Sequence, residues 1–208
     1  MADPMVPSVA QMDDQIFVGN AAASRDAATL RENVITAIVS LLDTESSVQD
    51  APGNWTVVPQ DRHLLLHCRD ISTMDLIPLL PKVCDFIDRE IASPPLDDGP
   101  APHSPDSTGK VLIHCTQGMS RAPAVGIAYL MRKRSCGLHK IMAEMKRKRD
   151  IRPRDSFMEQ LQVWETLGYE PWQDSSEETP KEEYQEFLDR LDVKVRRKRP
   201  ANDQDSGS

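Results

Sequence analysis

Residues 111–123 constrain the fold of this 208-residue chain more than any other segment. The apolar start of the segment predicts a strand, and the stretch that follows it predicts a helix. A turn between such elements directs successive backbone N–H groups, and the positive end of the helix, into one concavity that suits a phosphate dianion. The segment therefore predicts a phosphate-binding loop at the end of a strand. It reads Val111-Leu112-Ile113-His114-Cys115-Thr116-Gln117-Gly118-Met119-Ser120-Arg121-Ala122-Pro123.

Cys115 and Arg121 stand six positions apart in this loop. The field that attracts a phosphate dianion also favours a thiolate over a thiol, so Cys115 is the predicted nucleophile. The Arg121 guanidinium can hold two phosphate oxygens at once, which a lysine ammonium cannot do with the same geometry. Gly118 stands where the loop must turn tightly, and a residue without a Cβ adopts positive φ there at little cost. His114 could orient the loop through a hydrogen bond.

The order of these residues resembles the signature of cysteine-dependent protein phosphatases, and Ser120-Arg121 is similar to the dual-specificity branch. The resemblance implies an α/β fold of three αβα layers around a mostly parallel sheet, as in protein-tyrosine phosphatases. It also implies hydrolysis of phosphotyrosine, phosphoserine or phosphothreonine through a phosphocysteine intermediate, without a metal or other cofactor. No kinase-docking domain precedes Gln15, so an atypical member is expected. Around Cys115, the implied phosphate loop comprises His114, Thr116, Gln117, Gly118, Met119, Ser120 and Arg121.

Members of this family carry an aspartate general acid on an upstream loop, and Asp70 fits that position between a strand pattern and a helix pattern. An oxygen leaving group needs a proton as its bond to phosphorus breaks, and the ionised carboxylate can later take a proton from the attacking water. Asp75 is the alternative candidate, but it lies where a helix N-cap belongs. Asp70 is therefore the predicted general acid.

Two positions depart from the family pattern. Many members have a hydroxyl residue directly after the arginine, where it helps the cysteine sulfur leave, whereas this chain has Ala122. We therefore expect slow hydrolysis of the intermediate. Further along, Arg154 replaces an asparagine that is common before the last catalytic helix, so Asp155 or Ser156 is expected to cap that helix.

The variable loop positions are neutral, which favours a phosphoprotein substrate. Enzymes of this superfamily that act on inositol phosphates or phosphoinositides often place lysines there. Nucleic acid is not expected, because no aromatic stacking set with interleaved basic residues flanks the loop. Phosphatases of RNA ends or of phosphoinositides remain alternatives, as does a phosphoprotein-binding scaffold with little turnover. Residues 132–154 carry ten Lys or Arg against two acids, which either steer acidic partners or form ordinary solvated helix faces.

Composition indicates an intracellular protein with a net charge of −8. The sequence has no run of eighteen apolar residues and no signal-peptide pattern, so no membrane association is expected. The four cysteines lack paired metal spacing, and a reactive thiolate suits a reducing compartment. We expect a monomer in the cytoplasm, the nucleus or both.

Alternating strand and helix patterns predict the α/β class. Predicted strands cover residues 15–19, 37–41, 64–67 and 111–114, and predicted helices cover 26–33 (capped by Ser24), 75–91, 120–134, 138–148 and 156–167. The expected domains are an N-terminal tail (1–12), a catalytic domain (13–170) with a mobile proline-rich insertion (92–109), an acidic accessory helix (171–193) and a basic, disordered tail (194–208). Residues 194–199 are either a nuclear-import signal or a solvated tail.

Overall fold

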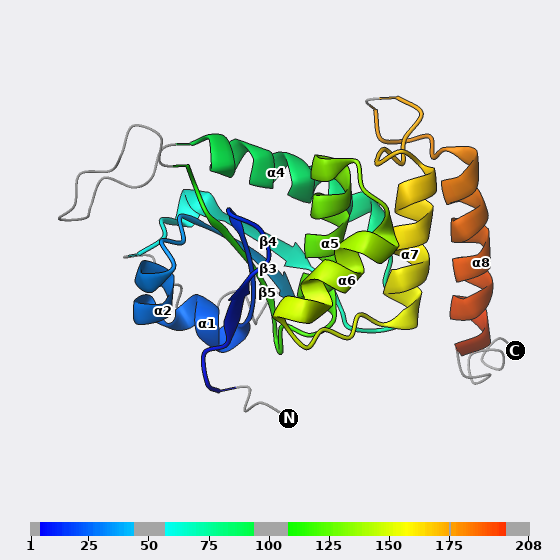
Figure 1. Ribbon diagram of the computed structural model, residues 1–208. Helices are drawn as coiled ribbons and strands as arrows, with labels where there is room; N and C mark the ends of the chain where they lie inside the picture. Colours follow the sequence, from blue (N-terminus) through cyan, green and yellow to red (C-terminus); the bar gives the residue numbers. More distant parts are fainter. Residues whose placement is uncertain (1–4, 44–56, 94–107, 175, 199–208) are drawn as a thin grey trace, which may run out of the picture.

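A five-stranded sheet forms the centre of the computed structural model, which describes residues 5–43, 57–93, 108–174 and 176–198 (Figure 1). The strands, in the spatial order β1-β2-β5-β3-β4, are β1 (Val9–Gln11), β2 (Ile16–Asn20), β3 (Ala37–Leu42), β4 (His63–His67) and β5 (Val111–Cys115). Strand β1 pairs antiparallel with β2, and the other pairs are parallel. The predicted mostly parallel sheet is therefore confirmed.

The helices cover both faces of this sheet. They are α1 (Ala21–Arg25), α2 (Ala27–Glu32), α4 (Leu80–Ala92), α5 (Arg121–Arg134), α6 (Leu138–Lys148), α7 (Asp155–Thr166) and α8 (Glu182–Lys198), with 3₁₀ turns η1 (Gln60–Arg62) and η2 (Ile77–Leu79). Side chains of β5 alternate between two cores: Val111 and Ile113 pack with α4–α7, and Leu112 packs with Leu30 of α2. The predicted three-layer αβα arrangement is confirmed.

Strand β5 is the central strand of the sheet and places Cys115 at its carboxyl end. All five of its residues are buried, as expected for a central strand flanked by parallel neighbours. Cys115 lies opposite Asn20 of β2, and His114 lies opposite Ser40 of β3. Ligands of open α/β sheets bind at the carboxyl ends of such strands, and β5 ends at the predicted phosphate loop.

The N-terminal segment differs from the prediction. Residues 9–11, assigned to a tail, form β1 instead, because Asn20 at the end of β2 holds the preceding segment through hydrogen bonds to Ser8 N and Val6 O. The cap predicted at Ser24 is also wrong. Ser24 lies inside α1, and the side chain of Asp26 caps α2 by accepting from Thr29 N at 2.7 Å.

The C-terminal accessory helix begins and ends later than predicted. Helix α8 runs alongside α7 on the outside of the molecule (Figure 1), and it continues to Lys198, so the predicted boundary at residue 193 falls within the helix. Tyr184 and Phe187 are buried against Ile77 and Leu167. Apolar packing therefore attaches α8 to the segment between Asp70 and α4. Most of the predicted insertion, residues 94–107, lies outside the described residues.

Candidate active site

The phosphate loop folds tightly beneath the Cys115 sulfur. Gly118 N donates to Cys115 Sγ at 3.3 Å, the kind of contact that stabilises a thiolate. Gly118 has φ +68°, as predicted, and a Cβ added there would lie 2.4 Å from the carbonyl oxygen of Gly19 on β2. Neither the conformation nor the space admits a side chain, so glycine fixes the loop against the sheet.

Arg121 begins α5 and is buried, with 3% of its surface exposed. Its Nη1 donates to Asp43 Oδ1 at 2.6 Å, to the Cys68 carbonyl at 2.8 Å and to the Leu41 carbonyl at 3.4 Å. Its Nη2 donates to Thr116 Oγ1 at 3.1 Å, while the buried Nε has no hydrogen-bond partner. One edge of the guanidinium is therefore anchored, and the Nε–Nη2 edge keeps donor capacity for an oxyanion.

Asp70 lies on the other wall of the same pocket, on the segment between β4 and η2. Its Oδ1 accepts from Ser120 Oγ at 3.2 Å and from Arg154 Nε at 2.5 Å. Its Oδ2 is 3.9 Å from Arg121 Nε, and its backbone N–H donates to Asp43 Oδ1 at 3.4 Å. The structure thus brings the predicted acid beside the predicted nucleophile and phosphate binder.

A pocket of about 450 Å³ joins these groups. Its lining residues are Asp43, Asp70, Cys115, Thr116, Gln117, Met119, Ser120, Arg121, Arg152 and Arg154. Gly118 and His114 do not line the pocket, since Gly118 packs on β2 and His114 points into the sheet. The described residues contain no group of three or more His, Cys, Asp or Glu arranged to hold a metal ion, and none of their helices is long and apolar enough to cross a membrane.

Asp75, the alternative acid, serves the adjoining backbone and α8. Its carboxylate accepts from Ile77 N at 3.0 Å and from Tyr184 Oη at 2.7 Å, and it does not line the pocket. Burial raises the pKa of Asp75 above the ordinary value. The predicted cap at Asp75 is wrong, because η2 starts at Ile77 with Leu76 at its N-cap and α4 starts only at Leu80, and neither has a side-chain cap bond.

His114 supports the loop from inside the sheet. Its Nε2 lies 2.7 Å from Ser40 Oγ of β3, so the end of β5 is tied to its neighbour. Burial lowers the pKa of His114 to about 3. The imidazole is therefore neutral at pH 7 and adds no charge behind Cys115.

We expect this neutral imidazole to make the fold acid-sensitive. In the unfolded chain His114 becomes protonated below pH about 6.5, whereas in the folded chain it stays neutral down to about pH 3. The stability of the fold therefore falls as the pH decreases from about 6.5 to about 3. The slope attributable to one such group is about 1.4 kcal/mol per pH unit. The free energy of unfolding, measured with urea, should decrease between about pH 7 and about pH 5 in both proteins, and the decrease should be about 1–2 kcal/mol smaller in His114→Gln than in wild type. Equal losses would contradict this assignment.

Sequence reasoning missed Asp43 and the position of Arg149. Asp43 follows the buried strand β3 at the same sheet edge as Cys115, a signal that could have identified it. Arg149 belongs to the basic stretch, yet it lies beneath the loop, with Nε donating to Gly118 O at 3.1 Å and Nη1 to Ser8 Oγ at 3.0 Å. Its role is therefore partly structural.

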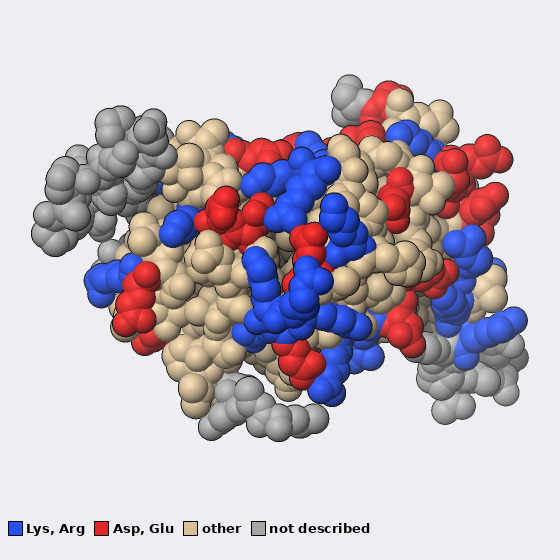
Figure 2. All heavy atoms as spheres, viewed as in Figure 1, with Lys and Arg blue, Asp and Glu red and all other residues tan. Residues whose placement is uncertain are grey.

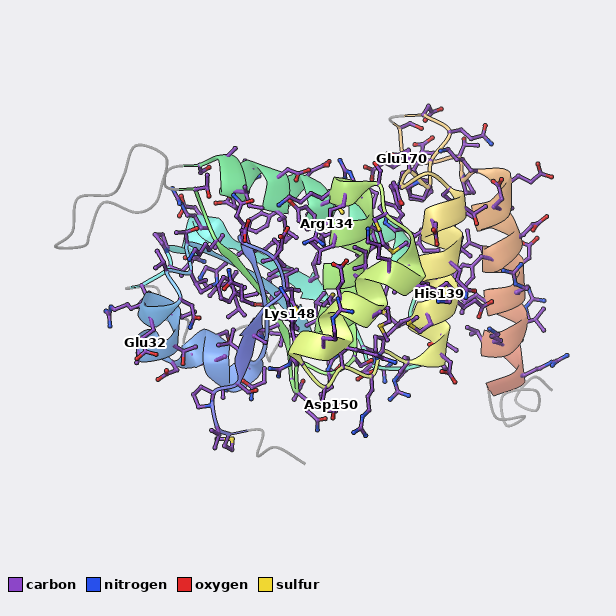
Figure 3. The ribbon with its side chains drawn as sticks, viewed as in Figure 1. Glu32, Arg134, His139, Lys148, Asp150 and Glu170 are labelled. Atoms are coloured by element: carbon purple, nitrogen blue, oxygen red, sulfur yellow. The ribbon has the colours of Figure 1, made fainter. Side chains whose placement is uncertain are left out.

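Other Lys and Arg side chains of the basic stretch 132–154 lie on the surface. Figure 2 shows Lys and Arg gathered below the centre of the view, and Figure 3 places Lys148 there, at the end of α6, with Asp150 beyond it. Arg152 and Arg154 extend the cationic surface to the pocket wall. Arg152 pairs with Asp150 at 2.9 Å.

The start of α7 differs from the prediction. Its N-cap is Arg154, without a side-chain cap bond, and Asp155 is already its first residue, so neither Asp155 nor Ser156 acts as the cap. The Arg154 side chain instead reaches Asp70.

Cys68 and Cys84 are buried thiols. Burial raises the pKa of both Cys68 and Cys84 to about 12. At neutral pH these two side chains carry no thiolate, so they are not alternatives to the predicted nucleophile Cys115.

Comparison with known proteins agrees with this architecture. The family model "Dual specificity phosphatase, catalytic domain" matches residues 16–167. Dual specificity protein phosphatase 1B of Arabidopsis thaliana is 28% identical over 159 residues, covering 76% of this chain and 81% of that protein. Dual specificity protein phosphatase Mpk3 of Drosophila melanogaster is 27% identical over 152 residues, which are 73% of this chain but 32% of that protein.

The crystal structure of human DUSP28 superposes with a TM-score of 0.64 at 25% identity, covering 80% of this chain and 98% of that one. The resemblance predicted from the phosphate loop is confirmed. Because the family match spans more than half of the sequence, the chain belongs to the dual-specificity phosphatases, cysteine-dependent enzymes defined by this catalytic domain.

Proposed function

We propose that this protein hydrolyses phosphate monoesters on proteins, with Cys115 as nucleophile, Arg121 as phosphate binder and Asp70 as general acid and base. The observation that carries the proposal is their convergence in one pocket, where the open Nε–Nη2 edge of Arg121 has the Asp70 carboxylate 3.9 Å away. Family membership supports the reaction class.

In the first step the Cys115 thiolate attacks phosphorus. Backbone N–H groups of the loop and the Arg121 fork hold the non-bridging oxygens, and they oppose the charge that builds up on them. As the bond to the leaving oxygen breaks, Asp70 transfers its proton to that oxygen. The products are the free hydroxyl of the substrate side chain, a phosphocysteine and an ionised Asp70.

In the second step water replaces the sulfur. The Asp70 carboxylate takes a proton from the water as its oxygen bonds to phosphorus, and the sulfur leaves as a thiolate. Inorganic phosphate departs, and the initial protonation states return. Ala122 is fully buried and has no hydroxyl to offer the departing sulfur, so we expect this step to limit turnover.

The pocket walls support a phosphoprotein substrate. The variable loop positions that line the pocket, including Thr116, Gln117 and Met119, are neutral. The wall of the pocket also contains the cationic side chains of Arg152 and Arg154. The side chain of Arg152 is 71% exposed, so it can meet acidic residues flanking a phosphorylated side chain. A compact polyanion such as an inositol polyphosphate would require more cations inside the loop.

Asp70→Asn tests the acid role. With a poor leaving group such as phenol, kcat/KM, which reports the first step, should fall by about 10²–10³-fold, because no proton reaches the departing oxygen. With an activated phenol, which leaves without a proton, the loss of kcat/KM should be below about tenfold. The measurement is kcat/KM for a series of aryl phosphates. A loss of equal size across the series would show that Asp70 is not the general acid.

A further inference from the structure

The start of α7 and the general-acid segment meet through one ion pair. Arg154 Nε donates to Asp70 Oδ1, and the Asp70 carboxylate has no helix or strand of its own to hold it. Ser120 Oγ is its other close side-chain donor, at 3.2 Å. The orientation of the carboxyl group over the pocket therefore depends on two side chains from elements distant in sequence.

Arg154 is held on a fixed base. The neighbouring backbone N–H of Arg152 donates to the carbonyl of Met119 at 2.7 Å, which ties this segment to the phosphate loop. Phe157 is fully buried in the first turn of α7. Within the same helix, the buried Gln160 bonds to both Leu76 N (2.6 Å) and Met74 O (2.9 Å). The start of α7 therefore contacts residues 70–76, the segment that carries the predicted acid, at both ends: Arg154 at Asp70 and Gln160 at Met74 and Leu76.

From this geometry we infer that Arg154 is a positioning residue for the reaction: it aims the Asp70 carboxyl group at the leaving oxygen and stabilises the carboxylate that forms when the proton departs. The inference rests on the proposed acid role of Asp70. The guanidinium interacts more strongly with a developing carboxylate than with a neutral carboxyl group, so its contribution grows toward the transition state. Misplacing a catalytic group by about 1 Å can cost about 10²-fold in rate.

The contact also explains why an arginine can stand at this position. The donor is Nε, which lies part-way along the side chain, and Arg154 itself lines the pocket. Lysine would carry the charge but has no donor at the Nε position. Arg154→Lys is therefore expected to restore only part of the function lost in Arg154→Gln.

The test compares the rate constant of the first step, measured in single turnovers, for phenyl phosphate and for an activated aryl phosphate in Arg154→Gln, Asp70→Asn and the double variant. We expect Arg154→Gln to lower this rate constant about 10–100-fold with phenol as leaving group and less than about threefold with the activated phenol. In the Asp70→Asn background the same substitution should have almost no further effect. Arg190→Gln is the control, since Arg190 pairs with Glu159 of α7 at 3.6 Å and does not line the pocket, and it should leave the dependence on the leaving group as in wild type.

An equal loss on both substrates, or a loss that persists in the Asp70→Asn background, would overturn the positioning role while leaving the proposed function intact. A rise in the substrate concentration that gives half of the maximal first-step rate, with that maximal rate unchanged, would assign Arg154 to substrate binding and would equally overturn it. If Asp70→Asn itself shows no dependence on the leaving group, the assignment of the acid fails first, and this inference fails with it.

Discussion

Cys115→Ser is expected to abolish phosphatase activity, with a loss of kcat on the order of 10⁴-fold or more. A serine hydroxyl at the end of β5 has no imidazole base to activate it, because the neighbouring His114 is buried and turned toward Ser40, and Asp70 must be protonated to act as the acid of this step. The remaining donors of the loop still bind phosphate, but no covalent intermediate can form at a useful rate. The measurement is steady-state hydrolysis of an activated aryl phosphate.

Binding provides the control for this variant. The Nε–Nη2 edge of Arg121 and the loop N–H groups are unchanged, so Cys115→Ser should bind inorganic phosphate at least as tightly as wild type by calorimetry, because the substitution removes no group that binds phosphate oxygens. If Cys115→Ser hydrolysed the substrate as fast as wild type, the measured hydrolysis would not come from Cys115. That result would support a phosphoprotein-binding scaffold.

Arg121→Lys should be the second most damaging change. Lysine keeps a positive charge but cannot present two parallel donors, so we expect kcat/KM to fall by about 10³-fold. It also cannot reach the Cys68 and Leu41 carbonyls together, and an unpaired buried acceptor costs about 1–3 kcal/mol in stability.

Two measurements separate these effects. Urea unfolding reports the stability loss, and kcat/KM on folded protein reports the loss of transition-state binding. Asp43→Asn is a matched comparison, since it removes the charge from the exposed ion pair on Nη1 and keeps an acceptor oxygen there for Arg121 and for the Asp70 backbone N–H. We expect its kcat/KM to fall much less than that of Arg121→Lys. Similar losses of kcat/KM in Arg121→Lys and Asp43→Asn would show that Arg121 acts mainly by anchoring the loop to Asp43, and not by bidentate binding of the phosphate.

The sequence predicted the parts of the site that are local in the chain. The strand, the turn at Gly118 and the helix from Arg121 follow one another without a gap, so spacing alone placed Cys115 and Arg121 around one concavity. The four strands of the parallel sheet were also recognisable, because each is a short apolar run.

Contacts between distant segments could not be predicted in the same way. The Arg154 to Asp70 ion pair depends on where α7 begins relative to the acid segment, 84 positions earlier in the chain, and no local pattern encodes that. Asp43 is likewise brought to Arg121 only by the pairing of β3 with β5. Strand β1 has three residues, which is too short for a periodic signal, and it exists because β2 offers a free edge.

The covalent intermediate is the central claim and can be observed directly. Because Ala122 offers no hydroxyl to the departing sulfur, phosphocysteine should accumulate during the first turnovers. Rapid acid quenching followed by peptide mass spectrometry should find one phosphoryl group on the peptide that contains Cys115 in wild type, and none in Cys115→Ser. Turnover at the wild-type rate without phosphate on Cys115, or with phosphate on another residue, would contradict the account.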